Sequence, residues 1–333
     1  MANTPYLGVS TKPNMGGANS DVDIHLEIYN GELDTRFEYN AIFRGLSTQR
    51  SVADKSNTYR IDRLNTSSVK GRTSGVALDA TKVTNDKLII TVSTVLYIRN
   101  PIDYQDDWTS PDWLREMGQN NGTEFAEVFD KAHLIQLIKG RSWVAPAHLA
   151  PAFKNGITIS AALTTAQTTQ AQREANAQAL FFAHRDAVNQ LIKRKVPMSD
   201  IVTLIYTDEY AALLEHPKLL NIADYAGTDG NSWGDRRIVK MNGVPVVECT
   251  EFPIAVDNAH PLGADFNVTA ADALCKMVVF SKSKTLVTVE AQPFTSRIWD
   301  DKLNFANVLD CIAMYNVGQR RPDTAAVVSV VYS

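Results

Sequence analysis

The chain has 333 residues with a formal net charge of −4, and 44% of its residues are hydrophobic. This length allows one large domain or two ordinary ones with a proper core, and the acidic balance argues against general nucleic-acid binding. No window approaches eighteen consecutive apolar residues and the first residues do not form a secretion signal. The composition therefore predicts a globular, soluble protein that does not span a membrane and stays in the compartment where it is made.

The amino end has too little apolar sequence to fold by itself. Residues 1–20 are rich in Asn, Gly, Ser, Thr and Pro, which predicts a disordered segment or a strap. Residues 24–43 have mixed periodicity, with apolar positions spread among polar ones. We therefore expect an amino-terminal arm over residues 1–46 that is packed against something else and is followed by the next element.

Residues 47–98 read as a long hairpin with almost nothing of its own to bury. The first arm ends at Leu64, a polar bend follows at 65–68, and residues 69–87 are mostly polar. A two-stranded hairpin alone is at best marginally stable in water, so this one needs a surface to lie on, which we expect to be another protein chain. The return arm alternates as a strand with two different faces does, with its apolar residues at Leu88, Ile90, Val92, Leu96 and Ile98.

The hairpin is basic although the chain is acidic. Residues 47–87 hold eight basic and four acidic residues, which is a net charge of +4, and the rest of the chain therefore carries −8. A basic arm on an acidic body is typical of self-association through charge complementarity, although a solvated hairpin accounts for the same count.

Two long helices are predicted after the hairpin. Ser110-Pro111-Asp112 is a helix start, with a capping Ser, a Pro in the first turn and an acid near the positive end of the helix dipole. An apolar stripe at helical spacing continues to Gly140, interrupted by Asn and Gly at 120–122. If the helix continues through this interruption, it spans about 40 Å. A link at 141–164 leads to a second helix at about 168–195.

From Asp200 onward the pattern changes to short strands and turns. Mixed strands beside two long helices predict an α+β fold rather than a doubly wound parallel sheet. The expected elements are a strand at 201–206, a helix at 208–214, a loop at 227–235, a turn into a strand at 243–247, a hairpin of 277–281 with 286–289, and β-prone runs from 303 to 331.

No catalytic or metal-binding pattern rises above background. The six histidines do not fall at ligand spacing with one another or with cysteine, and the loop at 228–235 lacks the carboxylate spacing of a calcium loop. There is no nucleophile elbow and no phosphate-binding loop. The acidic pairs at 106–107, 208–209 and 300–301 are better explained by turns and helix caps. The prediction is no catalytic residue, no metal, no cofactor, and three buried thiols at Cys249, Cys275 and Cys311.

Three strings and the order of elements resemble a known family. The strings are residues 28–37 (IYNGELDTRF), residues 242–247 (NGVPVV), and the segment from Asn304-Phe305 to the run RRPDTAAV at 320–327. Together they are similar to the major capsid proteins of tailed bacteriophages with the Hong Kong 97 type fold, and most similar to the short-tailed phages of the T-seven group. Each string alone is weak, but the resemblance extends over nearly the whole chain.

The resemblance implies a division of the chain into named regions. These are an amino-terminal arm at 1–46, an extended E-loop at 47–98, a peripheral P-domain at 99–198 with a spine helix at about 110–140, an axial A-domain at 199–292, and a return to the P-domain at 293–333. In that family the E-loop lies across a neighbouring subunit. On this basis we expect intersubunit ion pairs from Arg50, Arg60, Arg63 and Lys70.

The resemblance also implies partners and a place of action. Subunits of that family form hexamers and pentamers that close into an icosahedral shell around double-stranded DNA, which is enclosed without sequence-specific binding. A separate scaffolding protein, a portal protein at one vertex and an optional decoration protein are expected partners, with assembly in the host bacterial cytoplasm and a final location in the virion. The alternatives are an encapsulin-like nanocompartment, which shares the fold but encloses an enzyme, and an unrecognised soluble enzyme.

Overall fold

The computed structural model describes residues 41–52, 56–78, 80, 82–104, 113–216, 238 and 240–333. Predictions for the amino-terminal arm up to residue 40, the helix start at 110–112 and the loop at 227–235 lie outside these residues. The chain forms two compact units. One includes the described residues of 41–42, 94–129 and 292–315, and the other those of 43–93, 130–291 and 316–333.

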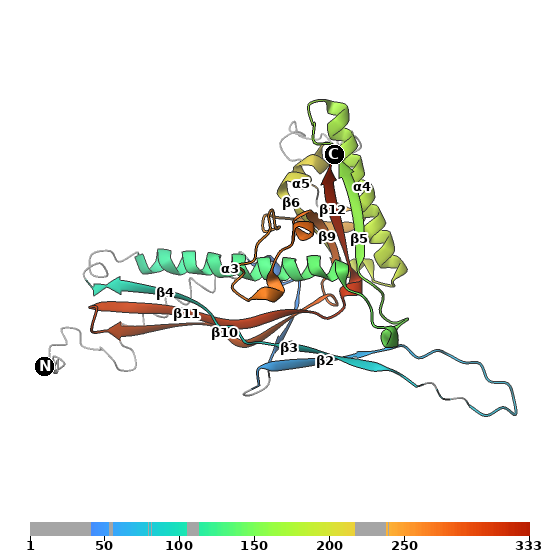
Figure 1. Cartoon of the computed structure of the whole chain (residues 1–333), viewed down its shortest axis with the longest axis horizontal. Helices are drawn as coiled ribbons and strands as arrows, with labels where there is room; N and C mark the ends of the chain where they lie inside the picture. Colours follow the sequence, from blue (N-terminus) through green and yellow to red (C-terminus); the bar gives the residue numbers. More distant parts are fainter. Residues whose placement is uncertain are drawn as a thin grey trace, which may run out of the picture. The chain divides into compact units, whose positions relative to one another are not determined.

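The second unit is built on a six-stranded mixed sheet with the order β5-β12-β9-β6-β8-β7 (Figure 1). The central strand β12 runs parallel to β5 and antiparallel to β9, and β9 is antiparallel to β6. Runs of buried apolar residues in β12, β9 and β6 account for their central position, because both faces of these strands are covered. The strands are β5 (Ile157–Leu163), β6 (Ile201–Tyr206), β7 (Lys240–Met241), β8 (Val244–Cys249), β9 (Cys275–Ser281) and β12 (Ala325–Tyr332).

Helix α4 (Gln170–Lys193) packs its apolar stripe onto this sheet through residues such as Leu180 and Leu191, which are fully buried. A capping box begins it: the Thr169 hydroxyl accepts from the Gln172 amide, and the Gln172 side chain accepts from the Thr169 amide. The short helix α5 (Thr207–Leu214) follows β6 directly. Both predicted helices and the strand between them are therefore confirmed, within two residues at each end.

Helix α3 (Trp113–Lys139) is a single helix of 27 residues, which corresponds to about 40 Å. The Asn and Gly residues at 120–122 do not break it. In the first unit, Phe125 and Phe129 make edge and tilted contacts with Phe294 and Tyr315. This packing outweighs the low helix propensity of the interruption.

A four-stranded sheet has the order β1-β10-β11-β4. It contains β1 (Thr48–Ser51), β10 (Leu286–Asp301), β11 (Ala306–Gln319) and β4 (Leu96–Asp103). The predicted hairpin of 277–281 with 286–289 is wrong, because β9 pairs with β12 and β6 whereas β10 belongs to this other sheet. Strand periodicity identifies a strand but not its partner, and the turn before Leu286 moves the chain from one sheet to the other. With two helices beside these sheets, the α+β fold class is confirmed.

The hairpin is shorter in its strands and longer in its loop than predicted. Strands β2 (Thr58–Leu64) and β3 (Asn85–Thr91) form a separate two-stranded sheet, in which Leu64 lies opposite Asn85. The bend therefore extends over residues 65–84 rather than 65–68. The return arm is also not one strand, since β3 ends at Thr91 and the following strand β4 pairs with β11. The alternation is continuous in sequence but is divided between two sheets.

A buried histidine makes the second unit sensitive to acid. The ring of His184 is fully buried; its Nδ1 accepts from Asn242 Nδ2 at 3.0 Å, so its Nε2–H donates to Thr203 Oγ1 at 2.9 Å. Burial lowers the pKa of His184 to about 4. The unfolded chain therefore binds a proton that the folded chain rejects as the pH falls from about 6.5 towards 4.

We expect the free energy of unfolding to be lower by about 2 kcal/mol at pH 5 than at pH 7 because of this one group. Denaturant titrations at both pH values, on the wild type and on His184→Gln, measure the difference. Gln178→Ala is the control, because this position of α4 is exposed and carries no titratable group, so the pH dependence should stay unchanged. A variant at position 184 that keeps the full pH dependence contradicts the assignment.

Several predicted absences concern only part of the chain. Among the described residues, no group of three or more His, Cys, Asp or Glu could hold a metal ion. No helix in that part of the chain is long and apolar enough to cross a membrane. The three cysteines are buried free thiols, as predicted. Burial raises the pKa of Cys249 to about 12 and that of Cys275 to about 11.

Candidate assembly hairpin and its anchor

The β2–β3 hairpin has two different faces. Cross-strand partners share a face, and the exposed pairs Arg60 with Ile89 and Asp62 with Lys87 lie on the same face. The opposite face carries Ile61 and Leu88, half-buried, and the buried Ile90 and Arg63. In the part of the chain that the structure describes, this sheet has two strands, so each of them is an edge strand. One face of the hairpin is therefore fixed to its own chain. The opposite face and the outer edges of both strands are not used by the β2–β3 hydrogen bonds.

Arg63 fixes the hairpin to its own chain. Its guanidinium donates to the backbone oxygens of Gln319 at 2.6 Å and Arg320 at 3.1 Å, and it lies 5.7 Å from the centre of the Trp143 ring. The residue is only 9% exposed. Burial lowers the pKa of Arg63, an effect that the nearby Asp86 and Asp323 partly offset. Charge-assisted bonds of this kind are about twice as strong as neutral ones.

A second anchor lies where the ladder ends. The Asn65 side-chain amide donates to the backbone oxygens of His148 at 3.2 Å and Ala150 at 2.9 Å. Thr84, across the hairpin, donates its hydroxyl to the same His148 oxygen. At the other end of the strands, Asn316 donates to the Thr91 oxygen at 2.7 Å. The base of the hairpin is thus fixed on both of its strands.

A close approach to β11 completes the base. A Cβ at Gly318 would clash with the Ile90 side chain, so this position requires glycine. The sequence expectation that the hairpin has almost nothing to bury therefore holds for the loop but not for the base, where Ile90 and Val92 are buried in the chain itself.

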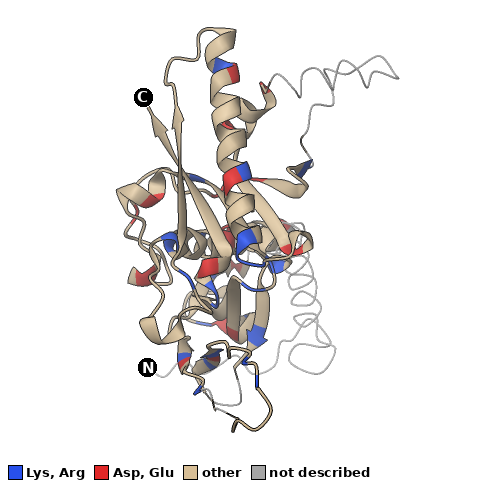
Figure 2. Cartoon of the chain, turned by 90° about the vertical axis from the view of Figure 1, so that its right-hand side faces the viewer, with Lys and Arg blue, Asp and Glu red and all other residues tan. Residues whose placement is uncertain are grey.

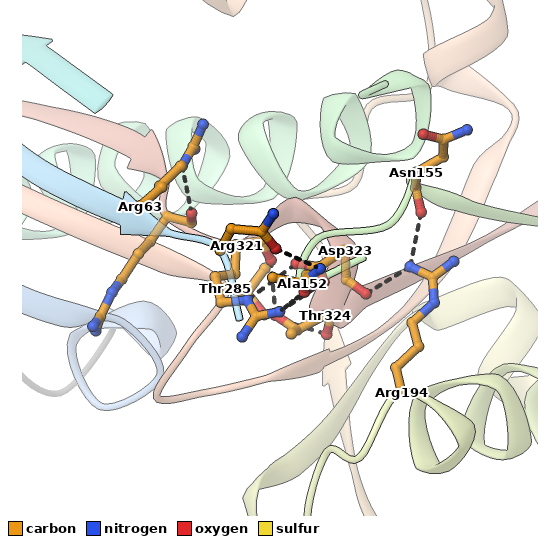
Figure 3. Close-up of polar contacts among 10 residues, drawn as sticks. Arg63, Ala152, Asn155, Arg194, Thr285, Arg321, Asp323 and Thr324 are labelled. Atoms are coloured by element: carbon orange, nitrogen blue, oxygen red, sulfur yellow. Dashed lines mark hydrogen bonds and ion pairs between the residues drawn. The ribbon is translucent and has the colours of Figure 1, made fainter. Parts of the chain in front are cut away.

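The segments that hold the hairpin meet at an ion pair, which we call the Arg321–Asp323 hub (Figure 3). Arg321 donates to both carboxylate oxygens of Asp323, at 3.2 and 2.9 Å, and to the Ala152 oxygen at 3.0 Å. Arg194, at the end of α4, donates to the backbone oxygens of Asp323 at 2.7 Å and Asn155 at 2.8 Å. The hub thereby joins the loop under the hairpin, α4 and the start of β12.

The loop beyond the anchors is exposed. Every described residue from 66 to 83 is exposed, including Val69 at 102% and Leu78 at 83%. A tight turn at 73–76 uses Gly75 with a φ of 90°, and Arg72 Nε donates to the Val76 oxygen at 2.6 Å. In Figure 1 this loop extends well past the ends of β2 and β3. A loop with such apolar side chains in solvent is typical of a surface that another molecule covers.

The four residues predicted to form intersubunit ion pairs do not lie in equivalent places. Arg50 in β1, Arg60 in β2 and Lys70 in the loop are exposed. Arg63 is buried and engaged within its own chain. The difference follows from strand geometry, because Arg60 and Arg63 are three positions apart in β2 and therefore lie on opposite faces.

The sequence patterns do not identify the anchoring residues. They place Asn65 only in a polar bend, and they use the segment containing Arg321 and Asp323 only as a family string. One available signal is the spacing of Arg321 and Asp323 just before a strongly apolar strand, since a charged pair beside a buried strand needs internal partners. No signal in the sequence identifies the carbonyl partners of Arg63.

We expect Arg63→Lys to lower the free energy of unfolding by about 1–2 kcal/mol, because an ammonium group cannot reach both carbonyls as a guanidinium does. Denaturant titration of the unassembled chain measures it. Arg60→Lys, on the exposed face of the same strand, is the matched control and should change stability by less than about 0.5 kcal/mol. Equal effects at both positions would contradict the anchoring role.

Comparisons with known proteins give structural relatives. The chain is similar to the bacteriophage PhiM1 mature capsid, with 45% identity, coverage of 98% of both chains and a TM-score of 0.77. It also resembles the capsid of cyanophage P-SCSP1u, at 17% identity, coverage of 88% and 89%, and a TM-score of 0.73. A virus-like particle from Pyrococcus furiosus shares the fold at 9% identity, coverage of 92% and 99%, and a TM-score of 0.54. No family model and no curated protein matches.

Proposed function

The chain belongs to the family of bacteriophage capsid proteins, and we propose that it acts by assembly, as the major capsid protein of a tailed phage. The observation that carries this function is the 45% identity to the PhiM1 mature capsid over 98% of both chains. Copies form hexamers and pentamers that close into an icosahedral shell around a double-stranded DNA genome. The protein is located in the virion and has a structural role.

The hairpin is assigned to contacts between copies. Its exposed face, its free edges and its loop correspond to an E-loop within residues 47–98, and α3 corresponds to the spine helix of a P-domain at 99–198. Residues 199–292 form the A-domain, residues 293–333 return to the P-domain, and residues 1–46 form the arm. Repetition by symmetry turns many modest interfaces into a stable shell.

Arg50, Arg60 and Lys70 supply ion pairs to the neighbouring copy, each contributing about 1 kcal/mol or less because exposed pairs are weak. Arg63 contributes differently from the expectation based on its sequence position. Since its guanidinium is engaged with Gln319 and Arg320, its part in assembly is to hold the hairpin in position.

The finer assignments rest on the three sequence strings and on the family. The short-tailed T-seven group is the proposed subgroup. A scaffolding protein during assembly, a portal at one vertex and an optional decoration protein are the proposed partners, and assembly takes place in the host cytoplasm. The protein catalyses no reaction.

Negative-stain microscopy of the purified protein tests the function, with nucleic-acid analysis of any particles. We expect closed shells several hundred ångströms wide in phage lysates, with DNA inside. A protein that stays monomeric under all assembly conditions, or particles that contain a cargo enzyme and no DNA, would contradict the proposal, the latter in favour of a nanocompartment.

A further inference from the structure

Six basic side chains meet at one end of the six-stranded sheet. Strand directions place them together: β5, β12 and β6 begin at this end and β9 finishes there, as shown by the pairs Ala326 with Ile157, Ala325 with Phe280, and Ile201 with Ser281. The end of α4 lies beside them. We call this set the basic end of the sheet; it consists of Lys154, Lys193, Lys195, Lys282, Lys284 and Arg320.

Hydrogen bonds join the segments that carry these side chains. Arg194, between two of the lysines, donates to the Asn155 oxygen at 2.8 Å, next to Lys154. The amide of Lys282 donates to the Asp200 oxygen at 3.0 Å, and the amide of Arg320 donates to the Thr285 oxygen at 2.8 Å. In Figure 2 basic segments, with acidic ones among them, are visible at the lower end of α4, where it meets the sheet. The segments that carry the six bases thus come together at this end of the sheet.

The acids of the described chain neutralise only a small part of this surface. Five of the six side chains are exposed and Lys284 is half-buried, and among the described residues none of the six takes part in an ion pair. Asp200 accepts from the hydroxyls of Ser281 and Ser283 and keeps its charge, so it offsets one of the six bases, whereas Asp323 is paired with Arg321. The positive charge therefore remains available to a partner that is not part of this chain.

At the end of α4, a lysine occupies a position whose backbone conformation favours glycine. Lys195 has a left-handed backbone with a φ of 61°, and it closes the helix through bonds from its own amide to Ile192 and from Val196 to Leu191. Glycine is the residue that adopts this conformation without strain. The negative end of the helix dipole favours a base near this point, but it accounts for Lys193 and Lys195 only and not for the bases on the other segments.

We propose that the basic end of the sheet binds the phosphate backbone of the packaged double-stranded DNA, without reading its sequence. This inference rests on the proposed function, which places DNA inside the shell. A second copy of the chain fits less well as the partner, because most acids at the opposite end of the same sheet are engaged internally: Glu209 with Tyr332, Glu215 with Arg173, and Asp272 with Arg141. The exposed Asp208 at that end offers a single charge. A polyanion supplies many charges at regular spacing and matches an unpaired cluster of this kind.

Fluorescence anisotropy of the unassembled full-length chain with a short labelled DNA duplex of mixed sequence tests the proposal. The test variant reverses Lys193, Lys195, Lys282 and Lys284 to Glu. We expect its affinity to fall at least about tenfold. The slope of log affinity against log salt should flatten by up to about 3.6, since each of four phosphates that is no longer neutralised changes it by about 0.9. The matched control reverses four dispersed bases, Lys82, Lys87, Arg297 and Lys302, and should weaken binding by less than about threefold.

The outcomes separate this proposal from the function on which it rests. Equal decreases in affinity in both variants, or no measurable DNA binding by the wild type, overturn the phosphate site. If the test variant alone fails to form shells while its DNA binding is unchanged, the phosphate site is also overturned. That result assigns the surface to contact with a second copy. If the wild type forms no shells under any condition, the capsid function itself fails, whatever the DNA titration shows.

If the variant with four Lys→Glu substitutions does not fold, two smaller variants still test the proposal. Lys282→Gln with Lys284→Gln should weaken DNA binding without affecting the fold. Lys195→Gly should raise the melting temperature, because it relieves the left-handed strain, and should weaken DNA binding at the same time. A Lys195→Gly chain with a higher melting temperature and unchanged affinity would count against the site.

Discussion

Replacement of residues 66–83 by the dipeptide Asn-Gly, which connects Asn65 to Thr84 through a two-residue turn, should abolish closed shells and leave the chain folded. The backbone amide of Asn65 already donates to the Thr84 oxygen at 3.0 Å, so the two anchored strands can be joined by a tight turn. The replacement removes the exposed apolar side chains and the bases of the loop but none of its anchors. Sedimentation and negative-stain microscopy measure shell formation, and the melting temperature of the unassembled chain reports folding.

A loop of the original length made of Gly and Ser is the control. It keeps the reach of the hairpin and removes its side chains, so it separates contact chemistry from length. We expect it to assemble poorly, because a flexible loop loses more conformational entropy on docking. Normal closed shells from the Asn-Gly chain would show that the loop is not part of the assembly contact.

Asp323→Ala should lower the free energy of unfolding by about 3 kcal/mol, the largest effect we expect from a single substitution. Breaking a buried ion pair leaves the remaining charge without its partner, at a cost of about 3–5 kcal/mol. The lower figure applies because the Arg321 side chain is 35% exposed, whereas that of Asp323 is 3% exposed. Denaturant unfolding of the unassembled chain gives the difference directly.

Two controls accompany this measurement. Asp323→Asn keeps the size and some hydrogen bonding, so we expect it to recover part of the stability. Asp186→Ala removes an exposed acid that lies 3.4 Å from Arg185 and should change stability by less than about 0.5 kcal/mol. A small effect at position 323, similar to that at 186, would show that the hub does not hold these segments together.

Local patterns predict most of the elements. The apolar stripe and capping residues of α4 determine its span, and the apolar run of β6 determines that strand. Partners are harder to predict, because the same alternation in residues 88–98 serves two sheets and the turn before Leu286 changes sheet. Side-chain periodicity reports which face of a strand is covered and does not report by what.

The candidate site could be predicted in place but not in detail. Composition indicates the exposed loop, since residues 69–87 cannot form a core. The role of Arg63 could not be predicted, because its partners are backbone oxygens more than 250 positions away in sequence. Every residue has a backbone carbonyl, so no pattern of residue types indicates which carbonyl oxygens accept from Arg63. The basic end of the sheet is also invisible in the sequence, since its members come from separate segments that only the strand order brings together.

Among the described strands, none pairs with the outer edges of the β2–β3 hairpin, and this has a consequence for the protein before it reaches a shell. A two-stranded ribbon with unpaired backbone on both sides is a template for indefinite strand addition between free copies. Charged side chains in the strands, with Arg60 and Asp62 on one and Lys87 on the other, oppose such growth by making a misregistered ribbon costly to desolvate. Neutral residues at these positions would cause newly made chains to precipitate as fibres, so part of the hairpin's charge serves the solubility of copies that have not yet found a neighbour.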